Sequence, residues 1–166
     1  MTDNAQAKET ASRNYERMAK VIAMTPFMKH LAMEFVEASD GYAKLRMRYQ
    51  NENSTAAKAL HGGAISSLID TTGAMAAWTT AEIARPNYFG STVGINVNYL
   101  SAAIGEDIFA EGRVLKRGKE IIYSDVRVTS GAGKLLAQGT VTYRIIERAA
   151  GEGALPGTQA GDGGAA

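Results

Sequence analysis

The chain has 166 residues, of which 45% are hydrophobic and 21% charged, a composition typical of one globular domain with a core. Its formal net charge of +1 gives no electrostatic basis for binding nucleic acid or a membrane surface, and its lack of cysteine excludes disulfides, thiolate catalysis and Cys-based zinc sites. Two histidines without a clear set of carboxylate partners indicate no metal site, and the absence of an apolar spanning run or a secretory pattern favours a cytoplasmic domain.

The first third of the chain predicts a helix and a pair of strands. Apolar residues recur at three- and four-residue spacing from 7 to 24, which is typical of an amphipathic helix. Two strands follow over 31–38 and 41–50, joined by the turn dipeptide Asp40-Gly41. The second strand has one buried face, because polar residues alternate there with Ala43, Leu45, Met47 and Tyr49.

A long helix and a set of strands follow. The stretch from about 62 to 83 is rich in Ala, Leu, Ile and Met, and Pro86 lies in the break that ends it. Four strands joined by glycine-containing turns are expected over 89–100, 106–117, 120–130 and 134–146. Consecutive antiparallel strands joined by short hairpins would form one sheet with the helix on one face, which is an α+β domain. Free sheet edges favour pairing between subunits.

These elements divide the chain into three segments. Residues 1–25 form an N-terminal helical extension, and residues 26–148 form the folded domain. Residues 149–166 are rich in Gly and Ala and contain a single large apolar residue, Leu155. This tail cannot bury enough apolar surface to become ordered, so we expect it to be disordered.

The long helix has two different faces. Its core-facing stripe consists of Ile65, Leu68, Ile69, Thr72, Met75 and Ala76. Asp70 lies almost opposite, among small residues and without Lys, Glu, Arg or Gln; these neighbours are Gly63, Ser66, Ser67, Gly73, Ala74, Ala77 and Ala81. Small residues let a backbone or a ligand approach closely, so we expect a partner subunit or a ligand to cover this face. A lone helical Asp is more often structural, but this setting favours a functional carboxylate.

The start of the same helix is His61-Gly62-Gly63. Two glycines there leave backbone N–H groups unshielded at the positive end of the helix dipole, which can stabilise an oxyanion formed from a carbonyl group. Gly63 and Asp70 are about 10 Å apart along the helix axis, too far for one carbonyl group to contact both. Two antiparallel copies of the helix could bring the Asp of one beside the glycines of the other, which predicts a dimeric site.

The stretch from His61 to Asp70 resembles the hotdog-fold acyl-CoA thioesterases of the phenylacetic-acid-degradation (PaaI-like) type. In that family a helix that begins with His-Gly-Gly carries an acid nine residues after the histidine, and a curved antiparallel sheet wraps it. The resemblance continues through 97–106, 117–119 and 133–140, and in all it spans roughly residues 26–146. The pattern favours thioester hydrolysis over dehydration, because the histidine and acid motifs of the hydratase and dehydratase branches are absent.

The resemblance also implies roles for individual residues. Asp70 would activate a water or attack the thioester carbonyl directly, and the N–H of Gly62 would bind the carbonyl oxygen. Thr92, early in the following strand, would hold the acid or its water, and His61 would orient the turn. The substrate would be an acyl-CoA, with CoA as part of the substrate and no separate cofactor or metal. The assembly would be a homodimer or homotetramer.

One position departs from the family pattern. The family has Asn or Gln six residues before the histidine, whereas this chain has Thr55 there and its nearest amide at Asn53. Either Asn53 still reaches the attacked carbonyl or this role is lost or modified, and we favour Asn53. A non-catalytic acyl-CoA-binding protein on the same fold is the alternative that this departure keeps open.

Basic residues gather at one predicted hairpin. Lys116, Arg117 and Lys119 surround Gly118, and this turn lies near the nucleotide end of the ligand in the family. A nearly neutral protein needs a local basic site to hold the phosphate groups of CoA, although a solvated turn of this composition is equally common. We therefore expect CoA contacts at Arg117, Gly118 and Lys119, and at Gly63.

Overall fold

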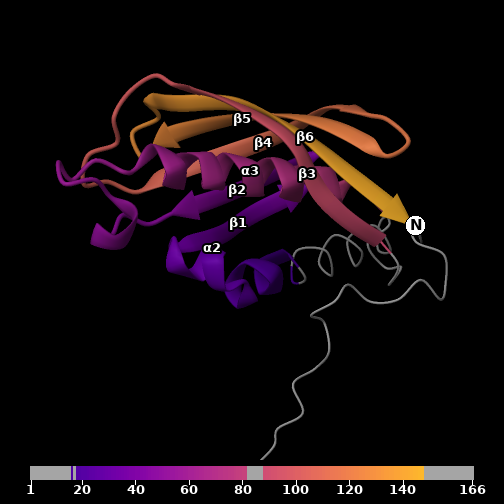
Figure 1. The fold of residues 1–166 in the computed structure, drawn as a ribbon, viewed down its shortest axis with the longest axis horizontal. Helices are drawn as coiled ribbons and strands as arrows, with labels where there is room; N and C mark the ends of the chain where they lie inside the picture. The colour runs from indigo at the N-terminus through magenta and orange to yellow at the C-terminus, as the bar shows by residue number, and fades with distance from the viewer. Residues whose placement is uncertain (1–15, 17, 82–87, 148–166) are drawn as a thin grey trace, which may run out of the picture.

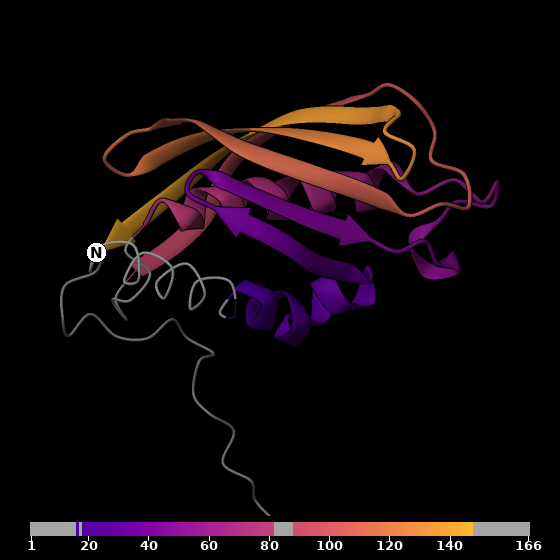
Figure 2. The ribbon, with the colours of Figure 1, turned by 180° about the vertical axis from the view of Figure 1, so that it is seen from behind.

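The computed structural model describes residues 16, 18–81 and 88–147, and in this part of the chain a curved six-stranded sheet wraps around a long helix (Figures 1 and 2). Residues 18–24 are helical. The elements that follow are α2 (Pro26–His30), β1 (Met33–Ser39), β2 (Tyr42–Met47), the 3-10 helix η1 (Asn51–Asn53), α3 (Gly62–Thr79), β3 (Tyr88–Tyr99), β4 (Ile108–Arg117), β5 (Ile121–Ser130) and β6 (Leu135–Glu147). The α+β architecture predicted from the sequence is confirmed.

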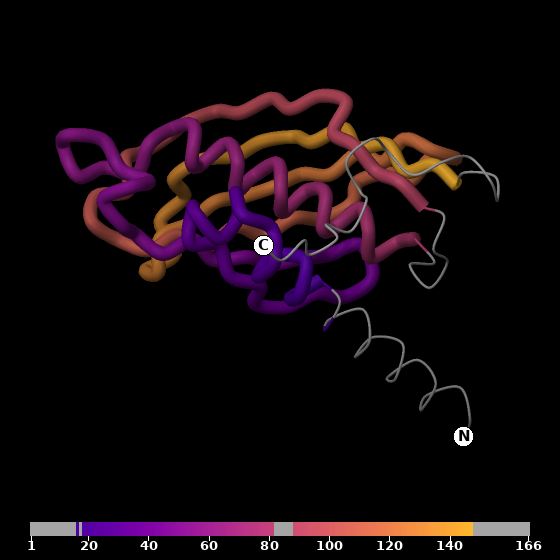
Figure 3. The backbone as a smooth tube through the Cα atoms, turned by 60° about the horizontal axis from the view of Figure 1, so that its bottom comes forward, coloured from indigo at the N-terminus to yellow at the C-terminus, as the bar shows by residue number. Residues whose placement is uncertain are grey.

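The order of the strands differs from the prediction at β3. The sheet has the order β1-β2-β4-β5-β6-β3, with all neighbours antiparallel, so β3 pairs with β6 and not with β4. The expected hairpin between β3 and β4 is therefore wrong, because the connection crosses the end of the sheet. An isolated bridge between Ala59 and Ile104 holds this crossing segment beside the loop that precedes α3. As a result β3 is an outermost strand (Figure 3).

The first hairpin follows the sequence pattern closely. Ser39 and Tyr42 are register partners across the predicted turn, and Gly41 has a φ of +66°, a conformation that favours glycine. The alternation in β2 is also confirmed, because Ala43, Leu45 and Met47 are fully buried. These side chains belong to the same hydrophobic core as α3, around which the sheet curves (Figure 1).

The predicted core-facing stripe of α3 is buried as expected; its members Ile65, Leu68, Ile69, Thr72, Met75 and Ala76 are at most 6% exposed. Gly73 differs from the prediction. A Cβ placed on it would lie 2.6 Å from Val141 Cγ2, so Gly73 faces β6 and its lack of a side chain sets the distance between helix and sheet. Ala77 and Ala81 are also buried within this chain. The open small-residue face around Asp70 is therefore limited to the first half of α3.

Some predictions concern residues outside the described ranges. They include the first part of the N-terminal helix and the tail at 149–166. Met18 and Ile22, in the described part of that helix, belong to the hydrophobic core. Among the described helices, none combines the length and the apolar character needed to cross a membrane.

Candidate active site

Asp70 lies in the middle of α3 and is half-buried. The hydroxyl of Thr92, on β3, donates a hydrogen bond of 2.7 Å to Asp70 Oδ1. Within the described chain no hydrogen bond uses the other carboxylate oxygen, Oδ2. The register of β3 shifts just after Thr92, at a bulge between Thr92 and Gly94. The carboxylate is thus held by one oxygen and, among the described residues, has no partner at the other, next to an edge strand.

Two aromatic side chains lie beyond Thr92 on the same side of the sheet. Tyr143, on β6, is the register partner of Thr92, and its hydroxyl accepts a hydrogen bond of 3.1 Å from Trp78 Nε1. The two rings meet edge to face, with centroids 6.4 Å apart. Burial raises the pKa of the Tyr143 phenol, the hydrogen bond from Trp78 opposes this, and the negative charge of Asp70 adds to the increase. Asp70 therefore lies close enough to Tyr143 for its charge to raise the pKa of the phenol.

The start of α3 is shaped by His61. Its backbone has φ −67° and ψ 138°, outside the helix, and its Nδ1 accepts a hydrogen bond of 2.9 Å from the Gly63 N–H. His61 is therefore the N-cap of the helix, with an unprotonated Nδ1. Its carbonyl accepts from the N–H groups of Ala64 and Ile65. Among the hydrogen bonds of the described residues none involves the Gly62 N–H, which leaves it available to a ligand.

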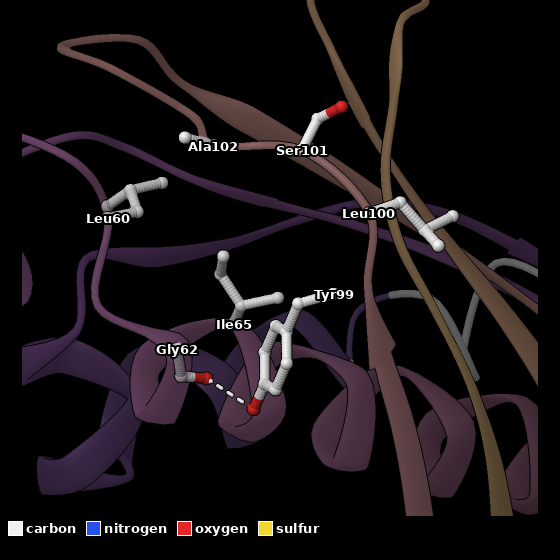
Figure 4. A pocket seen from close by; sticks show the side chains of 7 residues that line it. All are labelled: Leu60, Gly62, Ile65, Tyr99, Leu100, Ser101 and Ala102. Atoms are coloured by element: carbon white, nitrogen blue, oxygen red, sulfur yellow. Dashed lines mark hydrogen bonds between the residues drawn. The ribbon is translucent and has the colours of Figure 1, made fainter.

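A groove of about 380 Å³ lies beside Gly62 (Figure 4). It is bounded by the helix start and by the segment that leaves β3; its lining residues are Leu60, Gly62, Ile65, Tyr99, Leu100, Ser101 and Ala102. The Tyr99 hydroxyl donates a hydrogen bond of 3.1 Å to the Gly62 carbonyl and also contacts Ser66 Oγ. The groove gives a ligand access to the helix start.

Asn53 does not face this groove. It is 2% exposed, its Nδ2 donates to the carbonyls of Leu31 and Arg48, and its Oδ1 accepts from the Gln50 N–H. Every polar atom of the side chain is thus used inside the protein, and moving it would leave buried groups unpaired. The structure gives Asn53 a structural role, as an anchor of the loop before α3, in place of the catalytic role expected from the sequence.

Thr55 occupies the position where the family pattern has an amide. Its backbone N–H donates to Ala59 and its carbonyl accepts from Lys58, which closes a small loop before the helix. Its hydroxyl makes no hydrogen bond within the described residues.

The basic hairpin lies at the other end of α3. Arg117 Nη1 donates a hydrogen bond of 2.8 Å to Thr80 Oγ1, just after the helix, and the Gly118 N–H donates to the Ile121 carbonyl to close the turn. Lys119 is exposed. Gly63 and this hairpin are therefore at opposite ends of the helix within one chain. No group of three or more acidic or histidine side chains that could hold a metal ion exists among the described residues.

Sequence reasoning did not identify Tyr99 and Tyr143 as parts of the site. Alternation along β3 and β6 places each on the helix side of its strand, which is a usable signal. That signal does not show which helical residue each one meets, because this depends on the pairing of β3 with β6.

Comparison with known proteins gives consistent results. The model of the thioesterase superfamily matches residues 57–137. Acyl-coenzyme A thioesterase 13 of Homo sapiens is 36% identical over 138 residues, which covers 82% of this chain and 88% of that protein. The crystal structure of zebrafish thioesterase superfamily member 2 has a TM-score of 0.68 at 32% identity, over 81% of this chain and 97% of that one. The E. coli PaaI protein, at 17% identity, shares the fold with a TM-score of 0.72, over 82% of this chain and 96% of its own.

Proposed function

This chain belongs to the thioesterase superfamily and is a thioester hydrolase with the PaaI-like hotdog fold, and we propose that it hydrolyses acyl-CoA to a free acid and CoA. The observation that carries the proposal is the Asp70 carboxylate, which Thr92 holds at Oδ1 and whose Oδ2 has no hydrogen bond within the part of the chain that the structure describes. The name of the relative that is 36% identical, an acyl-coenzyme A thioesterase, supports the choice of substrate.

In this mechanism Asp70 acts as general base or as nucleophile. On the water route, Oδ2 accepts a proton from water while the water oxygen bonds to the thioester carbon. The carbonyl oxygen becomes an oxyanion, which the Gly62 N–H and the positive end of the helix dipole stabilise. Collapse of this intermediate breaks the C–S bond, and the proton held by Asp70 passes to the departing thiolate. On the other route, Oδ2 bonds to the thioester carbon and the C–S bond breaks, so that CoA leaves as the thiolate and a mixed anhydride remains. Water then hydrolyses the anhydride, which releases the acid, restores the Asp70 carboxylate and supplies the proton for the thiolate.

The two proposed catalytic groups, the Asp70 carboxylate and the Gly62 N–H, cannot act on one carbonyl group within a single chain. Gly62 and Asp70 are eight residues apart in α3, about 12 Å along the axis. A second copy of the chain with its α3 antiparallel would bring its Gly62 to Asp70 of the first. The outer edge of β3, where Val93 and Ile95 are 59% and 43% exposed, supports such pairing, because a long edge strand offers backbone N–H and C=O groups to another strand. We therefore assign the active unit to a dimer, alone or within a tetramer.

The basic hairpin fits the phosphate end of the substrate in this arrangement. Thr80, which binds Arg117, is about 15 Å from Asp70 along α3. An extended pantetheine arm spans a distance of this order. Arg117 and Lys119 would then bind phosphate oxygens, and the Gly118 N–H, already bonded to Ile121, would shape the turn.

The direct test is Asp70→Asn, which keeps the size and the hydrogen bond from Thr92 but removes the negative charge. We expect turnover of a panel of acyl-CoA thioesters, followed by release of free thiol, to fall at least about 10²-fold. Far-ultraviolet circular dichroism and the thermal midpoint provide the control for folding.

The alternative function is acyl-CoA binding without hydrolysis, which the absence of a family amide at Thr55 favours. Tight binding of acyl-CoA by the wild-type protein with no thiol release from any member of the panel would establish that alternative. Hydrolysis that persists unchanged in Asp70→Asn would instead refute the assignment of Asp70.

A further inference from the structure

The peptide unit between Gly62 and Gly63 is held at both ends. Its carbonyl oxygen, from Gly62, accepts the hydrogen bond of 3.1 Å from the Tyr99 hydroxyl. Its N–H, from Gly63, donates the bond of 2.9 Å to His61 Nδ1. Because a peptide unit is planar and rigid, it cannot rotate about its long axis without breaking both bonds.

Tyr99 also contacts the helix with its ring. A Cβ placed on Gly62 would lie 3.4 Å from both Cε1 and Cζ of Tyr99, so the ring covers the open side of this glycine. The phenol oxygen reaches one turn further along α3, where it contacts Ser66 Oγ. Figure 4 shows Tyr99 beside the groove, with its hydroxyl directed at the Gly62 carbonyl.

These contacts restrain the direction of the Gly62 N–H, which has no hydrogen-bond partner in the described ranges. On one side of the Gly62 Cα, the His61 carbonyl is fixed by the N–H groups of Ala64 and Ile65. On the other side, the peptide unit is fixed by Tyr99 and His61. Glycine has more backbone freedom than any other residue, so an N–H on glycine needs such restraint to keep one direction. Catalysis by an oxyanion donor requires that the donor be oriented before the reaction.

We propose that Tyr99 is a positioning residue that holds the Gly62 N–H in the direction needed to stabilise the oxyanion. This inference rests on the proposed function. Tyr99 acts through the Gly62 carbonyl and does not itself contact the reacting carbon. The hydroxyl performs this role, whereas the ring packs against Gly62 and forms part of the wall of the groove.

Tyr99→Phe separates the two parts of the side chain, because it removes the hydroxyl and keeps the ring. Loss of a complete oxyanion donor costs about 10²–10³-fold in kcat, so a donor that is present but misdirected should cost about tenfold. KM should change by less than about twofold, because the interaction forms in the transition state. The matched control is Tyr123→Phe, which removes a hydroxyl from an exposed tyrosine on β5, and it should leave kcat unchanged.

A double variant shows whether Tyr99 acts through the N–H. Gly62→Pro removes that N–H, and adding Tyr99→Phe to it should then lower kcat no further, whereas two independent effects would multiply. The amide resonances of Gly62 and Gly63 in the nuclear magnetic resonance spectrum should shift or broaden in Tyr99→Phe, while the thermal midpoint stays near that of the wild type.

Three results would overturn the inference: unchanged kcat in Tyr99→Phe, a loss confined to KM, or multiplicative effects in the double variant. Each of them leaves acyl-CoA hydrolysis itself intact. A wild-type protein without turnover on the acyl-CoA panel would instead contradict the proposed function, and the inference with it.

Discussion

Glycine and threonine residues lie on two sides of helix α3, and the same residue types have different roles on each side. On the sheet side, Gly73 packs against Val141 and the buried Thr72 hydroxyl donates to the Leu68 carbonyl. On the open side, the Gly62 N–H makes no hydrogen bond to a described residue, and Asp70 accepts a hydrogen bond from Thr92 of the neighbouring strand. The first side stabilises the fold through close contact. The second side holds the two polar groups that lack a partner among the described residues, and a groove adjoins one of them, the Gly62 N–H.

This difference shows that composition alone does not identify a functional face. Small residues appear on both sides of α3, for packing on one and for access on the other. The same type of substitution, made once on each side of α3, can therefore separate an effect on activity from an effect on stability. Such pairs also test whether a change on the sheet side leaves activity unaffected, as the contacts indicate.

The largest expected effect is at Gly62, the first residue of α3. Proline is well tolerated at this position, and the extended backbone of His61 suits a residue before proline, so Gly62→Pro should remove the N–H and keep the helix. We expect kcat to fall about 10²–10³-fold with little change in the thermal midpoint. Gly62→Ala keeps the N–H and is the matched control. Equal losses in the two variants would show that the N–H is not the important group.

Mixing two inactive variants tests whether the open side needs a second subunit. In a heterodimer of Asp70→Asn and Gly62→Pro, one shared site carries both changes and the other carries neither. Refolding an equal mixture should therefore restore about a quarter of wild-type turnover if dimers form at random. If the mixture is as inactive as each variant alone, Asp70 and Gly62 of one site come from the same chain.

The matched change on the sheet side is Gly73→Ala. The new methyl group would lie 2.6 Å from Val141 Cγ2, and overpacking of this kind costs about 1–3 kcal/mol of unfolding free energy, partly offset by better helix propensity. Denaturant unfolding measures the loss, and turnover per folded molecule should stay close to wild type. Adding Val141→Ala should recover part of the stability. A large fall in activity without loss of stability would mean that the two sides are coupled.

The smallest expected effect on kcat is at Thr92, and Thr72 is the matched position on the sheet side. Thr92→Val removes the hydrogen bond to Asp70, and a bond to a charged group is worth about 1.5 kcal/mol, or roughly tenfold in kcat. Thr92→Ser keeps the hydroxyl and should stay active. Thr72→Val, on the sheet side, should alter stability by at most about 1 kcal/mol and leave kcat unchanged. Similar kinetics for the two valine variants would contradict a role for Thr92 at the carboxylate.

Local patterns in the sequence were sufficient for most of the fold. The alternation of Ala43, Leu45 and Met47, the apolar stripe of α3 and the turn at Gly41 each follow from backbone geometry over a few residues. The same patterns led to the expected hairpin between β3 and β4, because chain order is the simplest guide to strand pairing. The structure pairs β3 with β6, from Tyr88 opposite Glu147 to Tyr99 opposite Ala137.

The sequence by itself determined most of the elements and indicated the two proposed catalytic groups, Asp70 and the glycine turn at Gly62, because these depend on residue type and short spacing. The tertiary structure decided what each residue meets. It buried the Asn53 amide among three hydrogen bonds, turned Gly73 toward Val141, and brought Thr92 and Tyr99 to opposite ends of the open side of α3. Apart from the two local bonds of Asn53 to Gln50 and Arg48, these contacts join segments 20 or more residues apart, and a single sequence holds no local signal for such pairings.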